Sequence, residues 1–445
     1  MNDSQKKKTA YRLDTSQSRR LYQQSLKLLP GGNTRHTAIF APYPVYAKSG
    51  NGCRVIDVEG EERIDFINNY TSLILGHSNP KILEALRNQI ERGVCFGMPT
   101  ESEIELASLI VERIESIDKL RFCNSGSEAV MLAIKAARAV SGKHKIAKFE
   151  GAYHGSYDYA QVSENPLPGE WGDPESPASV AEVSAAPSVK EDVIVMPWNN
   201  PKACEAIIEK NKRQLAAVLI DPLPARLGFI SPRPGFLEAI RDVARQNHIL
   251  IIADEVLTFR LSFHGASHSH ALAPDITVLG KIIGGGFPIG AVGGSDVVME
   301  VFDHTRNQKV HHGGTFNANP ISMRAGLATM RQLTPQAFGQ LNLMGDYLRD
   351  NLNQLFKRKK LRAQVTGQGS LFFFHPTDRE LLDYRSMVHS VKDPSFHNRL
   401  AHEMLANGII TSPSLGVGCL STPMKNEDLD AYINALEISL SSLSW

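Results

Sequence analysis

Short apolar stretches of about five residues alternate with amphipathic segments between residues 80 and 320. The apolar stretches have the length of buried strands, and the segments between them have the period of helices. This alternation is typical of a largely parallel sheet with helices on both faces, the α/β class. The predicted strands are Lys119–Cys123, Lys145–Phe149, Val193–Met196, Ala216–Ile220, Ile249–Ala253 and Ile276–Leu279.

The N-terminal part of the chain has a different pattern. Residues 1 to about 20 are polar and basic, and Arg19–Leu29 is expected to form a short helix ended by Pro30-Gly31-Gly32. Short apolar stretches between Pro44 and Phe66 are separated by Gly and charged turns, which predicts small antiparallel strands.

The C-terminal part predicts a long helix after about residue 320, a strand within Gly367–His375 and a helix that ends near Asn407-Gly408. A last amphipathic helix is expected over Glu427–Leu440. We therefore expect an N-terminal arm with a small-domain segment over 1–80, a large domain over 81–320 and a smaller α+β domain over 321–445.

Two local signals refine this outline. Thr100-x-x-Glu103 predicts a capping box at the start of a helix. The expected apolar face of that helix consists of Ile104, Ala107, Val111 and Ile114. The segment from Ser163 to Glu191 holds five prolines among Ser, Ala and Glu, so we expect a long surface excursion that could cover an active site.

Charge and composition indicate small molecules as partners. Lys plus Arg number 48 against 47 Asp plus Glu, and this balance does not suggest a nucleic acid or an anionic membrane. The five cysteines form no Cys-x-x-Cys pair, which fits a reducing compartment. The polar N-terminus lacks the apolar core of a signal peptide and no apolar run is long enough to span a membrane, so we expect a cytoplasmic protein.

Three segments that each follow a predicted strand carry the candidate chemistry, because ligands gather at the carboxyl ends of parallel strands. Asn124-Ser125-Gly126-Ser127-Glu128 opens a helix, where free N–H groups and small hydroxyls suit a phosphate. An ordinary helix cap explains that motif equally well. Asp254-Glu255 supplies a carboxylate that can keep a pyridine nitrogen protonated.

The third segment is Leu279-Gly280-Lys281, followed by Ile282-Ile283-Gly284-Gly285-Gly286. A desolvated lysine prefers its charged form less and can attack an aldehyde. The glycines allow backbone to approach a cofactor. A solvated lysine before a flexible loop would be the simpler interpretation if the other two segments were absent.

Together these segments resemble the class III aminotransferases of fold type I, which depend on pyridoxal 5'-phosphate (PLP), over nearly the whole chain from about Pro30. The resemblance implies a large domain with a mostly parallel sheet and a smaller α+β domain. It implies that Lys281 holds PLP as a Schiff base and moves the proton. Asp254 would hold the pyridine nitrogen, and Ser125, Gly126 and Ser127 the phosphate.

Two more positions match this family. Tyr153, with His154 in the GAYHG segment, corresponds to an aromatic ring that stacks on the cofactor face, although a buried tyrosine with a satisfied hydroxyl is the alternative. Thr315 in GGTFNANP corresponds to a threonine that reaches the phosphate of the neighbouring subunit. The resemblance therefore implies a homodimer with shared active sites.

Within the family the chain is similar to glutamate-1-semialdehyde aminomutase and to the β-phenylalanine and D-phenylglycine aminotransferases. The segment PGGNTRHTAIFAPYP resembles a stretch that carries a substrate-carboxylate arginine, here Arg35. A guanidinium suits a carboxylate because two parallel charged hydrogen bonds fix position and angle. Taken without this context, Arg35 would be interpreted as a surface ion-pair residue.

Some positions depart from the family pattern and leave specificity open. Asp221-Pro222 stands where relatives usually have Glu-Pro, and Pro224 replaces a frequent glutamine. Ser412-Pro413-Ser414 lacks the second arginine of the β-amino-acid enzymes. Arg226 is a possible substitute, although an exposed loop arginine is the more ordinary interpretation.

We therefore predict a transaminase that takes the amino group from a carboxylate-bearing donor, either a β-amino or an aromatic amino acid, and passes it to an oxo acid. An aminomutase of the glutamate-1-semialdehyde type is the alternative. The hypothesis of a nucleotide-binding module built on the IIGGG stretch has little support, since no Gly-x-Gly-x-x-Gly follows the first strand. A zinc site at His264, His268 and His270 is also weak, because no acidic or cysteine ligand lies nearby in the sequence.

Overall fold

The computed structural model describes residues 14–35, 37, 40–306 and 309–443. The chain forms two compact units, which we call the large unit (80–340 and 380–388) and the small unit (1–79, 341–379 and 389–445). The main segment of the large unit runs to residue 340, whereas the sequence placed this boundary at 320, and the large unit also includes residues 380–388. The difference arises because α12 (Pro320–Gln332) packs on α4 (Pro80–Ile90) and α5 (Glu101–Arg113) of the large unit. No described helix is long and apolar enough to cross a membrane.

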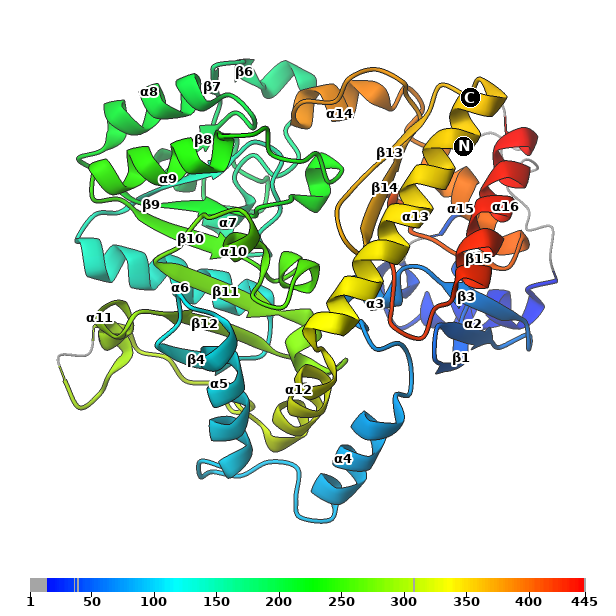
Figure 1. The fold of residues 1–445 in the computed structure, drawn as a ribbon, viewed down its shortest axis with the longest axis horizontal. Coiled ribbons are helices and arrows are strands. Elements are labelled where there is room, and N and C mark those ends of the chain that lie inside the picture. Colours follow the sequence, from blue (N-terminus) through cyan, green and yellow to red (C-terminus); the bar gives the residue numbers. More distant parts are fainter. Residues whose placement is uncertain (1–13, 36, 38–39, 307–308, 444–445) are drawn as a thin grey trace. The chain divides into compact units, whose positions relative to one another are not determined.

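A seven-stranded sheet forms the centre of the large unit, with the strand order β4-β12-β11-β10-β9-β5-β8 (Figure 1). Its strands are β4 (Lys119–Cys123), β5 (Lys145–Phe149), β8 (Val193–Met196), β9 (Leu215–Ile220), β10 (Leu250–Asp254), β11 (Ile276–Gly280) and β12 (Gly290–Gly294). All but β12 were predicted within one residue of these bounds, and the mostly parallel sheet is confirmed.

The unpredicted strand β12 runs antiparallel to both of its neighbours, β11 and β4. Its sequence is Gly-Ala-Val-Gly-Gly, which shows neither an apolar run nor an alternating pattern. A Cβ atom at Gly290 would lie 2.1 Å from the carbonyl oxygen of Ser125. Glycine is therefore needed at this position, because it lets β12 pass against the turn that follows β4.

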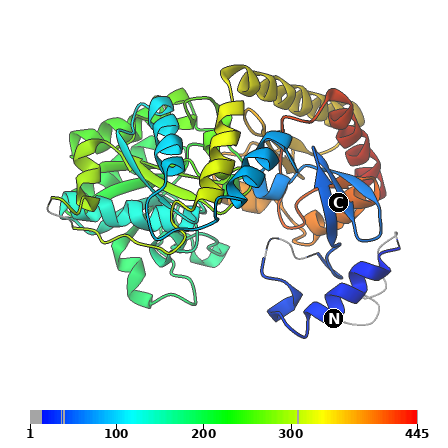
Figure 2. The same cartoon turned by 90° about the horizontal axis from the view of Figure 1, so that it is seen from below.

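Helices cover both faces of the sheet (Figure 1; Figure 2). On one face α6 (Gly126–Ser141) packs on Ala217, Leu219 and Ile252, which belong to one buried cluster. Alternate strand residues such as Val218 and Ile251 belong to the cluster on the other face. That second cluster includes the apolar sides of α8 (Pro201–Asn211) and α9 (Phe236–Gln246).

Two helix predictions were wrong in detail. Thr100 is the N-cap of α5, but its side chain makes no capping bond and its Oγ1 instead lies 2.9 Å from Ser102 Oγ. Leu106 and Ile110 are buried, whereas Ile104 of the predicted face is 69% exposed. Apolar residues occur around much of α5, so the pattern alone did not select the face that packs on α12.

The long helix predicted after residue 320 is two helices, α12 and α13 (Pro335–Lys359). Leu333 and Thr334 separate them, because a residue that precedes proline is disfavoured in the helical conformation. Short helices of the large unit are α7 (Asp158–Gln161), α10 (Ala266–Ser269) and α11 (Asp296–Met299). Helix α14 (Tyr384–Ser390) begins in the 380–388 segment of that unit.

The small unit contains two small sheets. One has the order β1-β2-β3-β15, with β1 (Ala47–Asn51), β2 (Arg54–Asp57), β3 (Glu62–Asp65) and β15 (Ile409–Ile410). The other has the order β13-β14-β16, with β13 (Gln364–Thr366), β14 (Leu371–His375) and β16 (Val417–Cys419). Besides most of α13, the small unit contains the helices α2 (Ser16–Ser25), α3 (Asn68–Thr71), α15 (Phe396–Ala406) and α16 (Asn426–Ser442). The small unit is thus of the α+β type.

Candidate active site

Three neighbouring strands of the large sheet have an ionisable residue at or directly after their last position. Asp254 is the last residue of β10, Asp221 follows β9 directly, and Lys281 follows β11 directly. Because β9, β10 and β11 are parallel neighbours, these residues lie at the same edge of the sheet. This edge is where ligands bind in open α/β sheets.

Asp254 is buried and is held by two hydrogen bonds. His154 Nδ1 lies 2.8 Å from Asp254 Oδ2, and the backbone N–H of Val256 donates to Oδ1 over 3.1 Å. A carboxylate accepts, so His154 carries its proton on Nδ1. His154 is fully buried, which lowers the pKa of its imidazole and favours the neutral ring. Its Nε2 is buried without a hydrogen-bond partner among the described residues.

Asp221 and Lys281 set the charge of the site beside Asp254. Burial, and then the charge of Asp254, raise the pKa of Asp221, while the backbone N–H of Leu223 and the charge of Lys281 oppose the increase. Two carboxyl groups and one lysine therefore interact at this edge. Lys281 has a left-handed backbone with φ of 48°, and such strain in a non-glycine residue clusters at functional sites.

The start of α6 adjoins this edge. Ser125 is the N-cap of the helix, and its Oγ accepts from the N–H of Glu128 over 3.2 Å. Ser127 Oγ accepts from the N–H of Ser156 over 3.1 Å. A Cβ atom at Gly126 would lie 2.8 Å from the side chain of Val256, two residues after Asp254. The helix start and the end of β10 are therefore packed too closely for a larger residue at Gly126.

A chain of side chains joins the segment around Thr315 to the turn after β4. Asn124 Nδ2 donates to Asn317 Oδ1 over 2.7 Å, and Asn317 Nδ2 lies 3.0 Å from His312 Nε2. The other ring nitrogen of His312 accepts from Arg121 Nε over 3.1 Å. Thr315 itself is exposed. Sequence reasoning missed this network: Asn317 lies within the GGTFNANP segment, but nothing in that segment indicates that its amide bonds to Asn124 and lies beside His312.

Tyr153 lies beside a charged cluster and is 46% exposed. The guanidinium carbon of Arg226 is 5.6 Å from the centre of the Tyr153 ring, a cation–π arrangement. Arg226 also forms an ion pair with Glu164 over 3.3 Å and donates to Asn165 Oδ1 over 2.7 Å. Arg226 is thus engaged by protein groups and is not a free loop arginine.

Arg35 belongs to the small unit. It is exposed, and its Nη1 donates to Asn69 Oδ1 over 2.7 Å. Its backbone N–H donates to Asn33 Oδ1 over 2.7 Å, which orders the chain on the N-terminal side. The neighbouring residues His36, Ala38 and Ile39 lie outside the described part of the chain.

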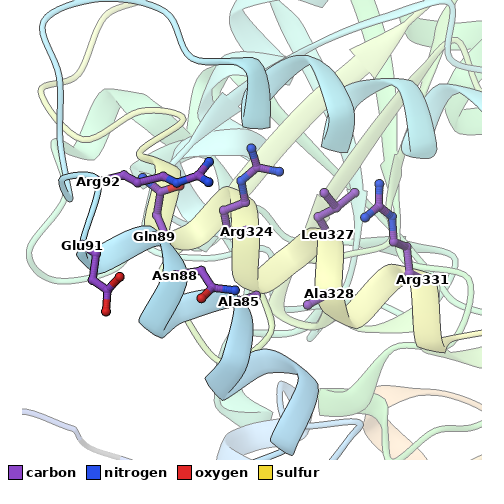
Figure 3. A pocket seen from close by; sticks show the side chains of 9 residues that line it. All are labelled: Ala85, Asn88, Gln89, Glu91, Arg92, Arg324, Leu327, Ala328 and Arg331. Atoms are coloured by element: carbon purple, nitrogen blue, oxygen red, sulfur yellow. The ribbon is translucent and has the colours of Figure 1, made fainter.

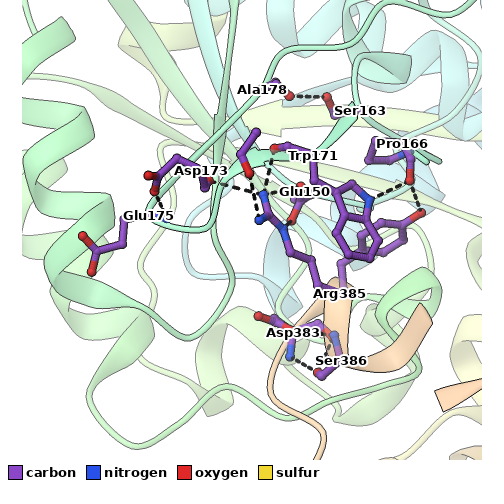
Figure 4. Close-up of polar contacts among 12 residues, drawn as sticks. Glu150, Ser163, Pro166, Trp171, Asp173, Glu175, Ala178, Asp383, Arg385 and Ser386 are labelled. Atoms are coloured by element: carbon purple, nitrogen blue, oxygen red, sulfur yellow. Dashed lines mark hydrogen bonds and ion pairs between the residues drawn. The ribbon is translucent and has the colours of Figure 1, made fainter. Parts of the chain in front are cut away.

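The 163–191 excursion contains only two-residue strands, β6 (Gly172–Asp173) and β7 (Ser176–Pro177), and short 3₁₀ turns. Figure 4 shows Arg385 between Glu150 and the backbone of this excursion. The guanidinium binds both oxygens of Glu150 over 2.8 and 3.0 Å and donates to the carbonyl of Trp171 over 2.8 Å. Glu150 directly follows β5, so Arg385 anchors the excursion to the sheet edge of the site.

Two other features of the large unit do not coincide with the predicted site. A cavity of about 480 Å³ between α4 and α12 is lined by Arg92, Arg324 and Arg331 among others (Figure 3). His264 and His268 have ring centres 4.9 Å apart, and His264 Nδ1 lies 2.9 Å from the carbonyl of Arg113. In the described ranges, no group of three or more His, Cys, Asp or Glu residues is arranged to hold a metal ion.

Comparison with known proteins agrees with this geometry. The family model described as "Aminotransferase class-III" matches residues 38–422. A glutamate-1-semialdehyde 2,1-aminomutase of Methanothermobacter thermautotrophicus is 38% identical, with 96% of this chain and 99% of that protein covered. The solved ω-transaminase of Sphaerobacter thermophilus is 46% identical, with a TM-score of 0.93 and coverage of 97% and 99%. A β-phenylalanine aminotransferase of Variovorax paradoxus is 34% identical, with a TM-score of 0.87 and coverage of 96% and 94%.

A lysine, two carboxyl groups and a helix start gather at one edge of the sheet, as expected of a PLP site, and the family model shows which family the chain belongs to. The chain belongs to the class III aminotransferase family, has fold type I and uses pyridoxal 5'-phosphate. The resemblance found in the sequence is therefore confirmed at the level of family, fold and cofactor.

The partner of Asp254 is the main site residue that sequence reasoning missed. His154 was noted beside Tyr153, but nothing in GAYHG indicates that its ring points to a carboxylate 100 positions later. The available signal was its place in the loop that follows the predicted strand Lys145–Phe149, since Asp254 and Lys281 also lie at or directly after strand ends.

The buried His154 predicts a specific dependence of stability on pH. Its pKa in the folded state lies below the ordinary value of about 6.5, so below that pH the unfolded chain binds a proton that the folded chain does not. Stability should therefore fall as the pH drops below about 6.5, by up to roughly 1.4 kcal/mol per pH unit from this group. His154→Asn, which keeps an N–H donor, should weaken this slope in urea unfolding of the apoprotein between pH 6.5 and 5.5.

The matched control is His144→Asn, which removes an exposed histidine and should leave the slope unchanged. Equal slopes in the wild type and in His154→Asn would mean that His154 does not titrate as its burial implies.

Proposed function

We propose that the chain is an aminotransferase that removes the amino group of a carboxylate-bearing donor, a β-amino or aromatic amino acid, and passes it to an oxo acid. Lys281 binds the cofactor and moves the proton at the substrate carbon. Asp254 faces the pyridine nitrogen, Tyr153 faces the ring, and Ser125, Gly126 and Ser127 bind the phosphate. When bound, the cofactor withdraws electrons from the substrate carbon.

The observation that carries this proposal is the buried Asp254, hydrogen-bonded to a neutral His154 at the same sheet edge as Lys281. A carboxylate in this position can keep a pyridine nitrogen protonated, and the buried imidazole holds the carboxylate in place. The crowded Gly126 and Gly290 bring the start of α6 close to the end of β10 and the start of β12, and a helix start at this edge can bind a phosphate.

The substrate class rests on Arg35 and on the named relatives. Arg35 is exposed, and within the described ranges its guanidinium donates one hydrogen bond, from Nη1 to Asn69 Oδ1, which suits a residue that binds a carboxylate with its other donors. Among similar enzymes, one carries the name β-phenylalanine aminotransferase, which supports a β-amino acid donor. A glutamate-1-semialdehyde aminomutase is the second candidate, because 38% identity over 428 residues supports it.

A homodimer with shared active sites is part of this proposal. Exposed large apolar side chains gather in one stretch of the large unit: Ile90, Val94, Phe96, Met98 and Ile104. Exposed apolar side chains in this number support a surface that a second copy of the chain covers. Phe316, beside the exposed Thr315, is also 58% exposed, which supports a role for Thr315 at the phosphate of the neighbouring subunit. A cytoplasmic location stays a prediction.

The fate of the amino group separates the transaminase from the aminomutase. A donor offered without an acceptor should release an oxo product in roughly one equivalent per active site and then stop, as a ping-pong mechanism requires. Addition of an oxo acid should restart turnover. The measurement is product quantification by mass spectrometry over a panel that includes β-phenylalanine and glutamate-1-semialdehyde. Complete isomerisation of glutamate-1-semialdehyde, without transamination of other donors, would instead support the aminomutase.

Arg35→Ala should raise KM for carboxylate-bearing donors by about tenfold or more, because a two-point charged contact is lost. Simple amines that lack the carboxylate should be affected much less, and the visible absorbance of the bound cofactor should stay unchanged. Arg35→Lys tests whether the two parallel hydrogen bonds of the guanidinium are needed, since an ammonium group keeps the charge but cannot form both bonds in the same geometry. If kinetics with every amino acid donor are unaffected in Arg35→Ala, the carboxylate is bound elsewhere, with Arg226 the next candidate.

A further inference from the structure

We propose that Lys148 is a positioning residue for the cofactor site, because its amino group is hydrogen-bonded to the residues at both ends of the loop that carries Tyr153 and His154. We call residues 153–161 the clamped loop. The inference rests on the proposed function, in which Tyr153 faces the cofactor and His154 holds Asp254.

The contacts of Lys148 define the clamp. Lys148 lies within β5 and is fully buried. Its Nζ donates to the carbonyl oxygen of Ala152 over 2.9 Å and to that of Val162 over 2.7 Å. Ala152 directly precedes the clamped loop and Val162 directly follows it. A single side chain therefore joins the two ends of the loop at the sheet edge of the site.

The clamped loop contacts the site at two further points. His154 Nδ1 lies 2.8 Å from Asp254 Oδ2 at the end of β10. The backbone N–H of Ser156 donates to Ser127 Oγ in the first turn of α6, where the phosphate is proposed to bind. A shift of the loop ends would therefore move the imidazole away from Asp254 and the Tyr153 ring away from its place. Lys148 acts through these residues and touches no reacting atom.

A lysine is an expensive residue to bury, so its presence calls for an explanation. Burial lowers the pKa of Lys148 to about 7, while the charges of Glu164 and Glu182 oppose the decrease. An apolar side chain would fill the same space without this cost, but it would leave two carbonyl oxygens without donors. Glu164 in turn pairs with Arg226, whose guanidinium lies beside the Tyr153 ring. The charged groups near Lys148 are thus linked to the clamped loop through Glu164 and Arg226.

Lys148→Met tests the clamp, because methionine has similar length and no donor. We expect a folded protein whose dissociation constant for pyridoxal 5'-phosphate rises roughly tenfold or more, since the clamped loop is displaced. The turnover number should fall more than KM changes, and the visible absorbance of the bound cofactor should differ from that of the wild type in its maximum or its pH dependence. Thermal unfolding of the apoprotein reports separately on the fold.

Lys143→Met is the matched control. Lys143 lies just before β5 and also donates to a backbone carbonyl over 2.8 Å, but that carbonyl belongs to Lys212 and not to an end of the clamped loop. This variant should keep the wild-type cofactor affinity and absorbance. If Lys148→Met is folded and matches Lys143→Met in both, the proposal is overturned.

Should Lys148→Met fail to fold, Lys148→Gln supplies the test with the same readouts. Its amide nitrogen is one bond closer to the backbone and cannot reach both carbonyls, so a wild-type cofactor affinity in this variant also overturns the proposal. Cofactor affinity and absorbance do not depend on the substrate. An enzyme that transaminates no donor would therefore contradict the proposed function without deciding the role of Lys148.

Discussion

A carboxylate at the end of a buried strand needs hydrogen bonds to replace water, and this constraint organises the site around Asp254. His154 supplies one of these bonds from the loop after β5, and Val256 supplies the other from the chain directly after β10. In the sheet, β9 separates β5 from β10. The bond from His154 therefore spans β9 and draws the loop with Tyr153 towards Asp254, at the edge where Asp221 and Lys281 also lie.

Much of this arrangement could be predicted from the sequence, because both strands and strand ends leave local signals. Six strands appeared as short apolar runs, and the rule that parallel strands end at one edge brought Ser125, Asp254 and Lys281 together. Strand β12 could not be predicted, because its glycines are required by close contacts, such as that of Gly290 with the Ser125 carbonyl, and they form no strand pattern. Long-range partners such as His154 and Asp254 leave no local signal either.

Buried charges are the other part that local pattern does not reveal. In the sequence, Lys148 is a polar residue within the apolar strand Lys145–Phe149, yet in the structure it is fully buried and hydrogen-bonded to two carbonyls. Arg385 lies far along the chain and still anchors Glu150 and the 163–191 excursion. Both side chains replace water for backbone groups next to the site, which is why charged residues are retained where apolar ones would be easier to bury.

Lys281 is proposed to bind the cofactor, and Lys148 offers a demanding comparison. Burial lowers the pKa of Lys148, another lysine of the large unit, so Lys148 is also a possible nucleophile. Reduction of the yellow holoenzyme with borohydride fixes the cofactor to its lysine, and peptide mapping by mass spectrometry then identifies that residue. The account predicts a label on Lys281 alone, in about one equivalent per chain. A label on Lys148, or on any lysine other than Lys281, would contradict it.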